Sequence, residues 1–137
     1  MMLILLFSCT EDHSFSLDER RQIIVVHNLL RLRIESDSSQ NDGKQMFLIH
    51  KKNEYNTKKI NILCLQDISP ELSIEKMNNH GIYKEIQIIK LCPNKKYTIT
   101  HNGMGGRVFI QEFYYTDSKG ILRVDRSRKR KVGYRDT

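Results

Sequence analysis

The sequence predicts a single α+β domain: a long N-terminal amphipathic helix packed on a mostly antiparallel curved sheet of about five to six strands, with one short extra helix. The length of 137 residues suits one domain. Apolar residues recur at helical spacing before residue 35, and from residue 45 onward they fall in short runs bounded by turn-forming residues. Because strands and helices do not alternate along the chain, a doubly wound parallel fold is not expected.

The first nine residues, Met-Met-Leu-Ile-Leu-Leu-Phe-Ser-Cys, form a short apolar run that polar residues follow at once. We interpret them as an export signal with cleavage near Ser8 or Cys9. The end of the run also resembles a bacterial lipobox, which makes Cys9 a lipidation candidate. No Lys or Arg precedes the run, so the alternatives are a buried first strand of a cytosolic protein or a start codon assigned too late. The predicted localisation is export, either secreted or membrane-anchored by lipid at Cys9.

Three cysteines, Cys9, Cys64 and Cys92, make an odd count. Removal or lipidation of Cys9 leaves Cys64 and Cys92 as a candidate disulfide in an oxidising compartment. The alternative is a pair of buried reduced thiols. No Cys-x-x-Cys motif occurs, and a structural zinc site is not expected.

Two segments carry helix signals. Ser16 to Glu19 fits a capping box, and the run 20–34 places Ile23, Val26, Leu30 and Ile34 on one stripe. The second segment begins at Ser69-Pro70-Glu71 and ends at His80-Gly81, with Pro in the first turn and Gly after the end.

Six runs have strand length and contain β-branched or aromatic residues. They are Gln45 to Lys51, Lys59 to Leu65, Ile82 to Leu91, Lys96 to His101, Arg107 to Thr116 and Ile121 to Arg126. Asp117 to Gly120 separates the last two and predicts a hairpin turn with Gly in the left-handed conformation.

No motif in the chain specifies catalysis. The glycine-rich segment 101–106 leads into a strand-like run and not into a helix, so an Asn-Gly turn explains it better than a phosphate-binding loop. The five histidines have no metal-ligand spacing, and the acidic pairs lie at predicted helix starts. We therefore predict no catalytic, cofactor-binding or metal-binding residues, and we do not expect an enzyme.

Residues 16–31 resemble the first helix of the CAP superfamily, the cysteine-rich secretory, antigen 5 and pathogenesis-related proteins. That helix typically shows an Ile-Val pair shortly before His-Asn-x-Leu-Arg. The matching positions are Ile23, Ile24, His27, Asn28, Leu30 and Arg31. The resemblance implies a secreted protein, ends at Arg31 and carries no active site.

Basic residues are concentrated at the C-terminus. Five of the seven net positive charges of the chain lie within residues 126–137. The polyanion-binding candidates are Arg126, Arg128, Lys129, Arg130, Lys131 and Arg135. Without apolar periodicity, this segment is predicted to be a flexible, solvated tail. The domain plan is therefore a signal over 1–9, one α+β domain over 10–125 and a basic tail over 126–137.

We expect a small exported, non-catalytic binding domain. Its partner is an unidentified protein, or a polyanion such as acidic lipid headgroups or glycans that bind the tail. A lipid anchor is the only membrane association expected. A truncated or diverged secreted CAP-like protein is one alternative, and an intracellular protein whose basic tail binds nucleic acid is another. Sequence-specific readout of nucleic acid is not expected, because no aromatic residue lies inside the basic run.

Overall fold

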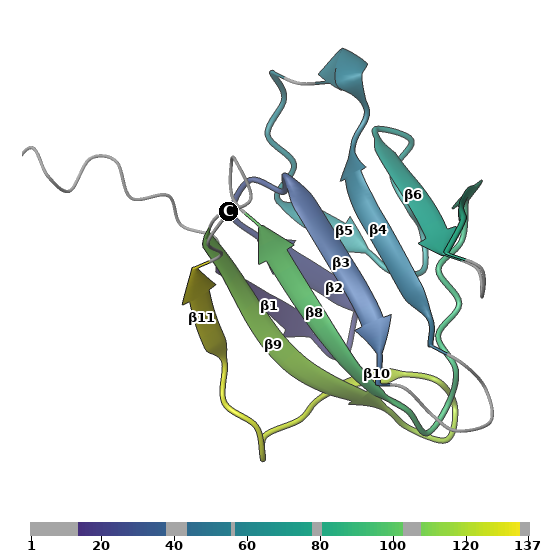
Figure 1. The fold of residues 1–137 in the computed structure, drawn as a ribbon, viewed down its shortest axis with the longest axis vertical. Helices are drawn as coiled ribbons and strands as arrows, with labels where there is room; N and C mark the ends of the chain where they lie inside the picture. The colour runs from purple at the N-terminus through teal and green to yellow at the C-terminus, as the bar shows by residue number, and fades with distance from the viewer. Residues whose placement is uncertain (1–13, 38–43, 56, 78–80, 103–107, 135–137) are drawn as a thin grey trace, which may run out of the picture.

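The protein is a two-layered antiparallel β-structure (Figure 1). The computed structural model describes residues 14–37, 44–55, 57–77, 81–102 and 108–134. The strands are β1 (Phe15–Asp18), β2 (Ile23–Val26), β3 (Arg31–Ser36), β4 (Met46–Lys51), β5 (Ile62–Cys64), β6 (Leu72–Met77), β7 (Tyr83–Ile86), β8 (Lys96–Asn102), β9 (Val108–Thr116), β10 (Leu122–Val124) and β11 (Lys131–Tyr134). Helical geometry among the described residues is limited to a 3-10 turn, η2 (Asn53–Tyr55), and none of them form a helix long and apolar enough to cross a membrane.

The larger sheet has eight strands and the smaller has three. The large sheet runs β10-β9-β8-β3-β4-β6-β7, and β11 pairs with β9 beside β10. The small sheet runs β1-β2-β5 and lies behind the large sheet in Figure 1. One face of the large sheet therefore packs on the small sheet, and the other face carries partly exposed side chains such as Thr98 and Gln111.

Alternating side chains build the core between the sheets. In β3 and β4 every second residue is buried, and Ile34, Phe47 and Ile99 lie side by side across neighbouring strands. The small sheet contributes Ile24 and Leu63, which are both fully buried. This period of two is what a strand needs when only one of its faces is covered.

The predicted N-terminal helix is wrong. Residues 15–36 form β1, β2 and β3. Gln22 and Asn28 have φ angles of 56° and 58°, which turn the chain between these strands. The run Ile23–Val26 is entirely β-branched and favours a strand. The expected capping residues instead make a turn, in which Asp18 Oδ1 accepts a hydrogen bond of 3.2 Å from the Arg21 amide.

The predicted short extra helix is also wrong. Residues 72–77 form β6, which pairs with β4 and β7. Ser69 does act as a local cap, because its hydroxyl accepts a hydrogen bond of 3.3 Å from the Glu71 amide. The chain then enters a strand, since Leu72 and Ile74 are buried at a spacing of two. The fold is consequently an all-antiparallel β-structure and not an α+β domain.

The six strands predicted from residue 45 onward are confirmed in position. Each of the six strand-like runs contains one observed strand, namely β4, β5, β7, β8, β9 and β10. The hairpin at Asp117 to Gly120 is confirmed as well. Gly120 has a φ angle of 80°, and its amide donates to the Asp117 carbonyl at 3.0 Å.

Candidate polyanion-binding surface

The basic C-terminal segment is folded against the large sheet. The sequence predicts a flexible tail from residue 126 onward, whereas Lys131–Tyr134 form β11, paired with β9. Residues 126–130 cross from the end of β10 to the start of β11. We call residues 126–131 the basic loop.

A turn stabilised by Asp125 begins the basic loop. Asp125 Oδ1 accepts hydrogen bonds from the amide and the hydroxyl of Ser127, at 3.0 Å and 2.5 Å. The bond from the Ser127 hydroxyl is the main cause that lowers the pKa of Asp125. The Asp125 amide donates to the Phe113 carbonyl at 3.0 Å, which fixes the start of the loop to β9.

Two arginines of the loop bind to the sheet. The Arg128 guanidinium carbon lies 3.8 Å from the centroid of the Phe113 ring, a cation–π contact. Its Nη1 lies 3.8 Å from Asp37 Oδ2. Arg130 Nε donates to Glu112 Oε1 at 2.6 Å, and Arg130 Nη2 lies 2.5 Å from the same oxygen. These contacts direct both guanidinium groups toward the sheet.

Glu112 joins the loop to the core. Its Oε2 accepts a hydrogen bond of 2.6 Å from the hydroxyl of Tyr114, whose side chain is almost fully buried. Burial, and then the hydrogen bond to Glu112, raise the pKa of Tyr114. The tyrosine therefore stays protonated and keeps donating to the carboxylate that binds Arg130.

Close packing holds the far end of the segment. Gly133 lies opposite Phe109 in the β11–β9 pair. A Cβ atom added at Gly133 would lie 2.1 Å from Cζ of the Phe109 ring. The ring therefore covers the glycine, and no larger residue fits there without displacement of the ring.

Three cations remain directed away from these anchors. Arg126, Lys129 and Lys131 are exposed, and among the residues that the structure describes none forms an ion pair with them. Val132 and Tyr134 of β11 are 66% and 63% exposed, and the alternation of the strand puts them on the face opposite to Lys131. Arg135, the remaining predicted polyanion ligand, lies outside the described residues, as does the lipidation candidate Cys9.

The predicted disulfide partners are free thiols in this structure. Cys64 ends β5 in the small sheet, opposite Ile23. Cys92 lies before β8, and its amide donates to the Tyr97 hydroxyl at 2.8 Å. Both cysteines are half-buried.

A shallow polar hollow lies on the solvent-facing side of the large sheet, next to the basic loop. It has a volume of about 520 Å³ and is lined by Glu35, Ser36, Asp37, Lys44, Thr98 and Gln111. Asp37 is the carboxylate beside Arg128, and Gln111 is the cross-strand neighbour of Lys131. The hollow and the basic loop therefore form one continuous surface.

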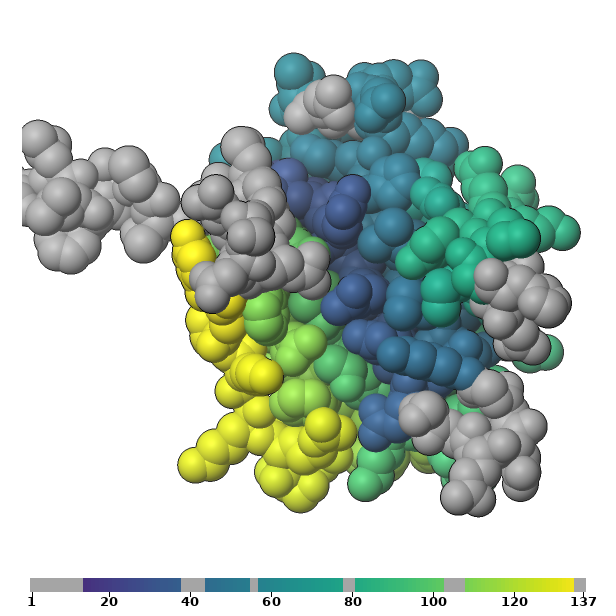
Figure 2. Space-filling model, in the orientation of Figure 1, coloured from purple at the N-terminus to yellow at the C-terminus, as the bar shows by residue number. Residues whose placement is uncertain are grey.

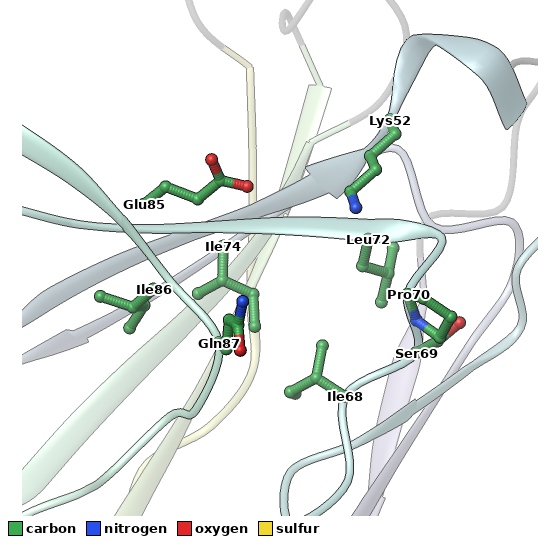
Figure 3. Close-up of a pocket in the computed structure, with 9 residues that line it drawn as sticks. All are labelled: Lys52, Ile68, Ser69, Pro70, Leu72, Ile74, Glu85, Ile86 and Gln87. Carbon is green, nitrogen blue, oxygen red and sulfur yellow. The ribbon is translucent and has the colours of Figure 1, made fainter.

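A second pocket, of about 350 Å³, lies at the opposite edge of the large sheet (Figure 3). Its apolar lining comes from Ile68, Leu72, Ile74 and Ile86. Lys52 and Glu85 lie at opposite ends of it (Figure 3).

No group of three or more potential metal ligands occurs among the described residues. His50 Nε2 lies 3.1 Å from Glu75 Oε1, which accounts for this histidine as one half of a surface pair. His101 is fully buried, and its Nε2 accepts a hydrogen bond of 3.3 Å from the Leu30 amide. Both histidines thus have structural contacts.

Sequence reasoning identified the basic residues but missed the acidic and aromatic groups that position them. Glu112 and Phe113 lie in β9, and Asp37 follows β3, far from the basic loop in sequence. The one available signal was the alternation in Gln111 to Tyr115, which puts Glu112 and Tyr114 on one face and Phe113 on the other.

Neither family models, curated proteins nor solved structures match the chain. Nothing further therefore supports the resemblance of residues 16–31 to the CAP superfamily. In the structure these residues form β1, β2 and the first residue of β3, in place of the helix that the resemblance implies.

Proposed function

We propose that this protein is a small exported, non-catalytic binding domain that contacts polyanions through its basic loop. The observation that carries the proposal is the arrangement of Arg126, Lys129 and Lys131. These three exposed cations lie on a segment that is fixed by β10 on one side and by β11 on the other. Internal ion pairs occupy Arg128 and Arg130, so the loop has a defined shape and a set of charges left for a ligand.

A fixed loop favours binding because less conformational freedom is lost when the ligand arrives. A flexible tail of the same composition would have to be ordered on the ligand at a cost of about 0.5–1.5 kcal/mol for each immobilised side chain. The cross-strand pairs of β11 with β9 meet part of that cost during folding.

Polyanions of the extracellular space suit these charges best. The ligands expected for an exported protein are acidic glycans and acidic lipid headgroups. Sequence-specific binding of nucleic acid is not expected, because no aromatic residue lies inside the basic loop and Arg128 covers one face of the neighbouring Phe113 ring. Binding should be electrostatic and should weaken as salt rises.

The test removes the three exposed charges and leaves the anchors intact. We expect the combined variant Arg126→Ala, Lys129→Ala and Lys131→Ala to elute from heparin at a clearly lower salt concentration than the wild-type protein. The matched control removes three exposed lysines on other elements, with Lys59→Ala, Lys84→Ala and Lys90→Ala. Equal elution shifts in both variants would show that net charge alone is responsible, and the proposed role of the basic loop would then be rejected.

Export is tested separately by the intact mass of the natively expressed protein. Loss of the first eight residues together with an added diacylglycerol on Cys9 is the outcome for a lipoprotein, and loss without lipid is the outcome for secretion. Retention of Met1 would contradict export.

A further inference from the structure

The polar hollow beside the basic loop has the chemistry of a site for sugar hydroxyl groups. Figure 2 shows this face of the large sheet, with the C-terminal segment in yellow beside the strands that carry the hollow. Its lining combines two carboxylates, an amide, two hydroxyls and an ammonium group. Its volume is about 520 Å³, and it is wide open to solvent, as a surface that binds one part of a longer ligand would be.

The carboxylates distinguish between classes of polyanion. Glu35 is bound by Lys44 Nζ at 2.9 Å and lies 3.4 Å from Arg33 Nε, so its position is fixed. Asp37 is half exposed, and among the described residues the ion pair of its carboxylate is the distant one to Arg128, at 3.8 Å. A sugar hydroxyl can donate a hydrogen bond to such a carboxylate. The phosphodiester backbone of DNA presents only acceptors there and would be repelled.

Hydrogen-bonding groups continue from the hollow toward the cations. Thr98 lies between Glu35 on β3 and Phe113 on β9, in one cross-strand row on the solvent-facing side. In the neighbouring row Gln111 lies between Thr100 and Lys131, and its Nε2 donates to the Thr100 hydroxyl at 3.2 Å. A ligand that crosses these rows meets hydroxyl-binding groups first and cations next.

We propose that the hollow and the basic loop together bind an acidic polysaccharide. The hydroxyl groups of one sugar ring occupy the hollow, and the acidic groups of neighbouring rings contact Lys131 and the rest of the loop. This assignment rests on the proposed polyanion binding and names its ligand class. A chain with one acidic group and several free hydroxyl groups on each ring matches both parts of the surface.

The test uses the sign of the effect of Asp37→Asn. The probes are hexagalacturonate and a thymidine heptanucleotide, which carry equal numbers of anionic groups but differ in free hydroxyl groups. For hexagalacturonate we expect about two- to threefold weaker binding, because a hydrogen bond to a charged group is replaced by one to a neutral group, and the removal of the repelling charge offsets only part of that loss. For the heptanucleotide we expect about twofold tighter binding, since a repelling charge is removed.

Thr98→Val provides a second variant of nearly identical shape. It removes the hydroxyl from the hollow, and we expect about fivefold weaker binding of hexagalacturonate and unchanged binding of the heptanucleotide. Asp67→Asn is the matched control, because it makes the same charge change at an exposed residue outside the hollow. Affinities are measured by titration calorimetry at low ionic strength, on variants whose urea unfolding matches that of the wild-type protein.

The possible outcomes separate the two proposals. Weaker binding of hexagalacturonate alone, in both hollow variants, supports the polysaccharide site. If Asp37→Asn binds both probes more tightly while the triple loop variant loses both, polyanion binding stands and the polysaccharide assignment is overturned. If the triple loop variant keeps its affinity for both probes, the proposed function itself fails.

Discussion

Replacement of Gln22 should lower the free energy of unfolding strongly. It lies in the turn between β1 and β2 and is only 5% exposed. Its side-chain amide pairs with the backbone of Leu122 in β10, as a neighbouring strand would. Nε2 donates to the Leu122 carbonyl at 3.0 Å and to the Glu19 carbonyl at 2.7 Å, and Oε1 accepts from the Leu122 amide at 2.9 Å. The side chain thus joins the two sheets.

The expected magnitude follows from the groups left behind. In Gln22→Ala the amide and the carbonyl of Leu122, a residue with no exposed surface, lose their partners. Each buried polar group left unsatisfied costs about 1–3 kcal/mol. We therefore expect a loss of about 2–6 kcal/mol in the free energy of unfolding, a large share of the roughly 5–15 kcal/mol typical of a domain.

Urea unfolding followed by tyrosine fluorescence measures this loss. Gln22→Met keeps the length of the side chain but none of its hydrogen bonds, so it should be nearly as destabilising as Gln22→Ala. Asn94→Ala is the control for the backbone, because Asn94 has a φ angle of 57°, close to the 56° of Gln22, but is exposed. A loss in Gln22→Ala no greater than in Asn94→Ala would refute the argument and assign the effect to backbone strain.

Three further predictions concern single groups. Burial raises the pKa of Tyr97 to about 12, so the stabilisation from its protonated form is complete below about pH 10 and is lost as pH rises through 12; Tyr97→Phe should flatten the alkaline fall in stability measured by urea unfolding. The Ile121 amide and further hydrogen bonds lower the pKa of Asp117, so its stabilisation is present above its unfolded-state pKa and is lost as pH falls through the folded value. Asp117→Ala should therefore reduce the acid dependence of stability, and an unchanged pH profile would contradict this. Gly133→Ala should separate β11 from β9 because of the Phe109 ring, which hydrogen exchange of the β11 amides would report. Adding Phe109→Ala to that variant should restore protection, and failure to do so would reject the steric explanation.

The sequence predicted strands well where turn residues mark both ends of an apolar run. The hairpin at Asp117 to Gly120 could be predicted because its turn depends only on neighbouring residues, with Gly120 in the left-handed conformation. The helix prediction for the N-terminal region was wrong because its apolar residues are dense enough to match both the helical period of 3.6 residues and the strand period of two. Ile23 and Val26 fit a helical stripe, whereas burial follows Ile24 and Val26. The left-handed conformation of Gln22 decides between them, and it depends on a contact with Leu122, which is 100 residues away in sequence.

For the candidate site, too, one part could be predicted from the sequence and another part could not. Charge is a property of composition, so the basic residues could be found from the sequence. Their order in space depends on Glu112 and Phe113, which reach the basic loop only when β9 pairs with β11. An expectation of flexibility for a run of cations holds only if the fold offers no carboxylate or aromatic ring within reach.

The two edges of the large sheet differ in a way that favours the basic edge as the binding surface. At the opposite edge β7 pairs only with β6, and like charges face each other across that pair, Glu75 with Glu85 and Lys76 with Lys84. If β7 of a second copy paired antiparallel with this β7, and both strands kept the same face toward the core, a pairing centred on the strand would place Lys84 opposite Lys84 or Glu85 opposite Glu85. Such charges on an open edge discourage pairing with another strand.

At the other edge β10 and β11 cover β9, and the side chains of Gln22 and Glu19 bind the free backbone amides of β10. The outward amides of Leu122 and Val124 are therefore occupied by side chains of this protein, and the exposed cations of the basic loop are the groups that this edge presents to an anionic ligand.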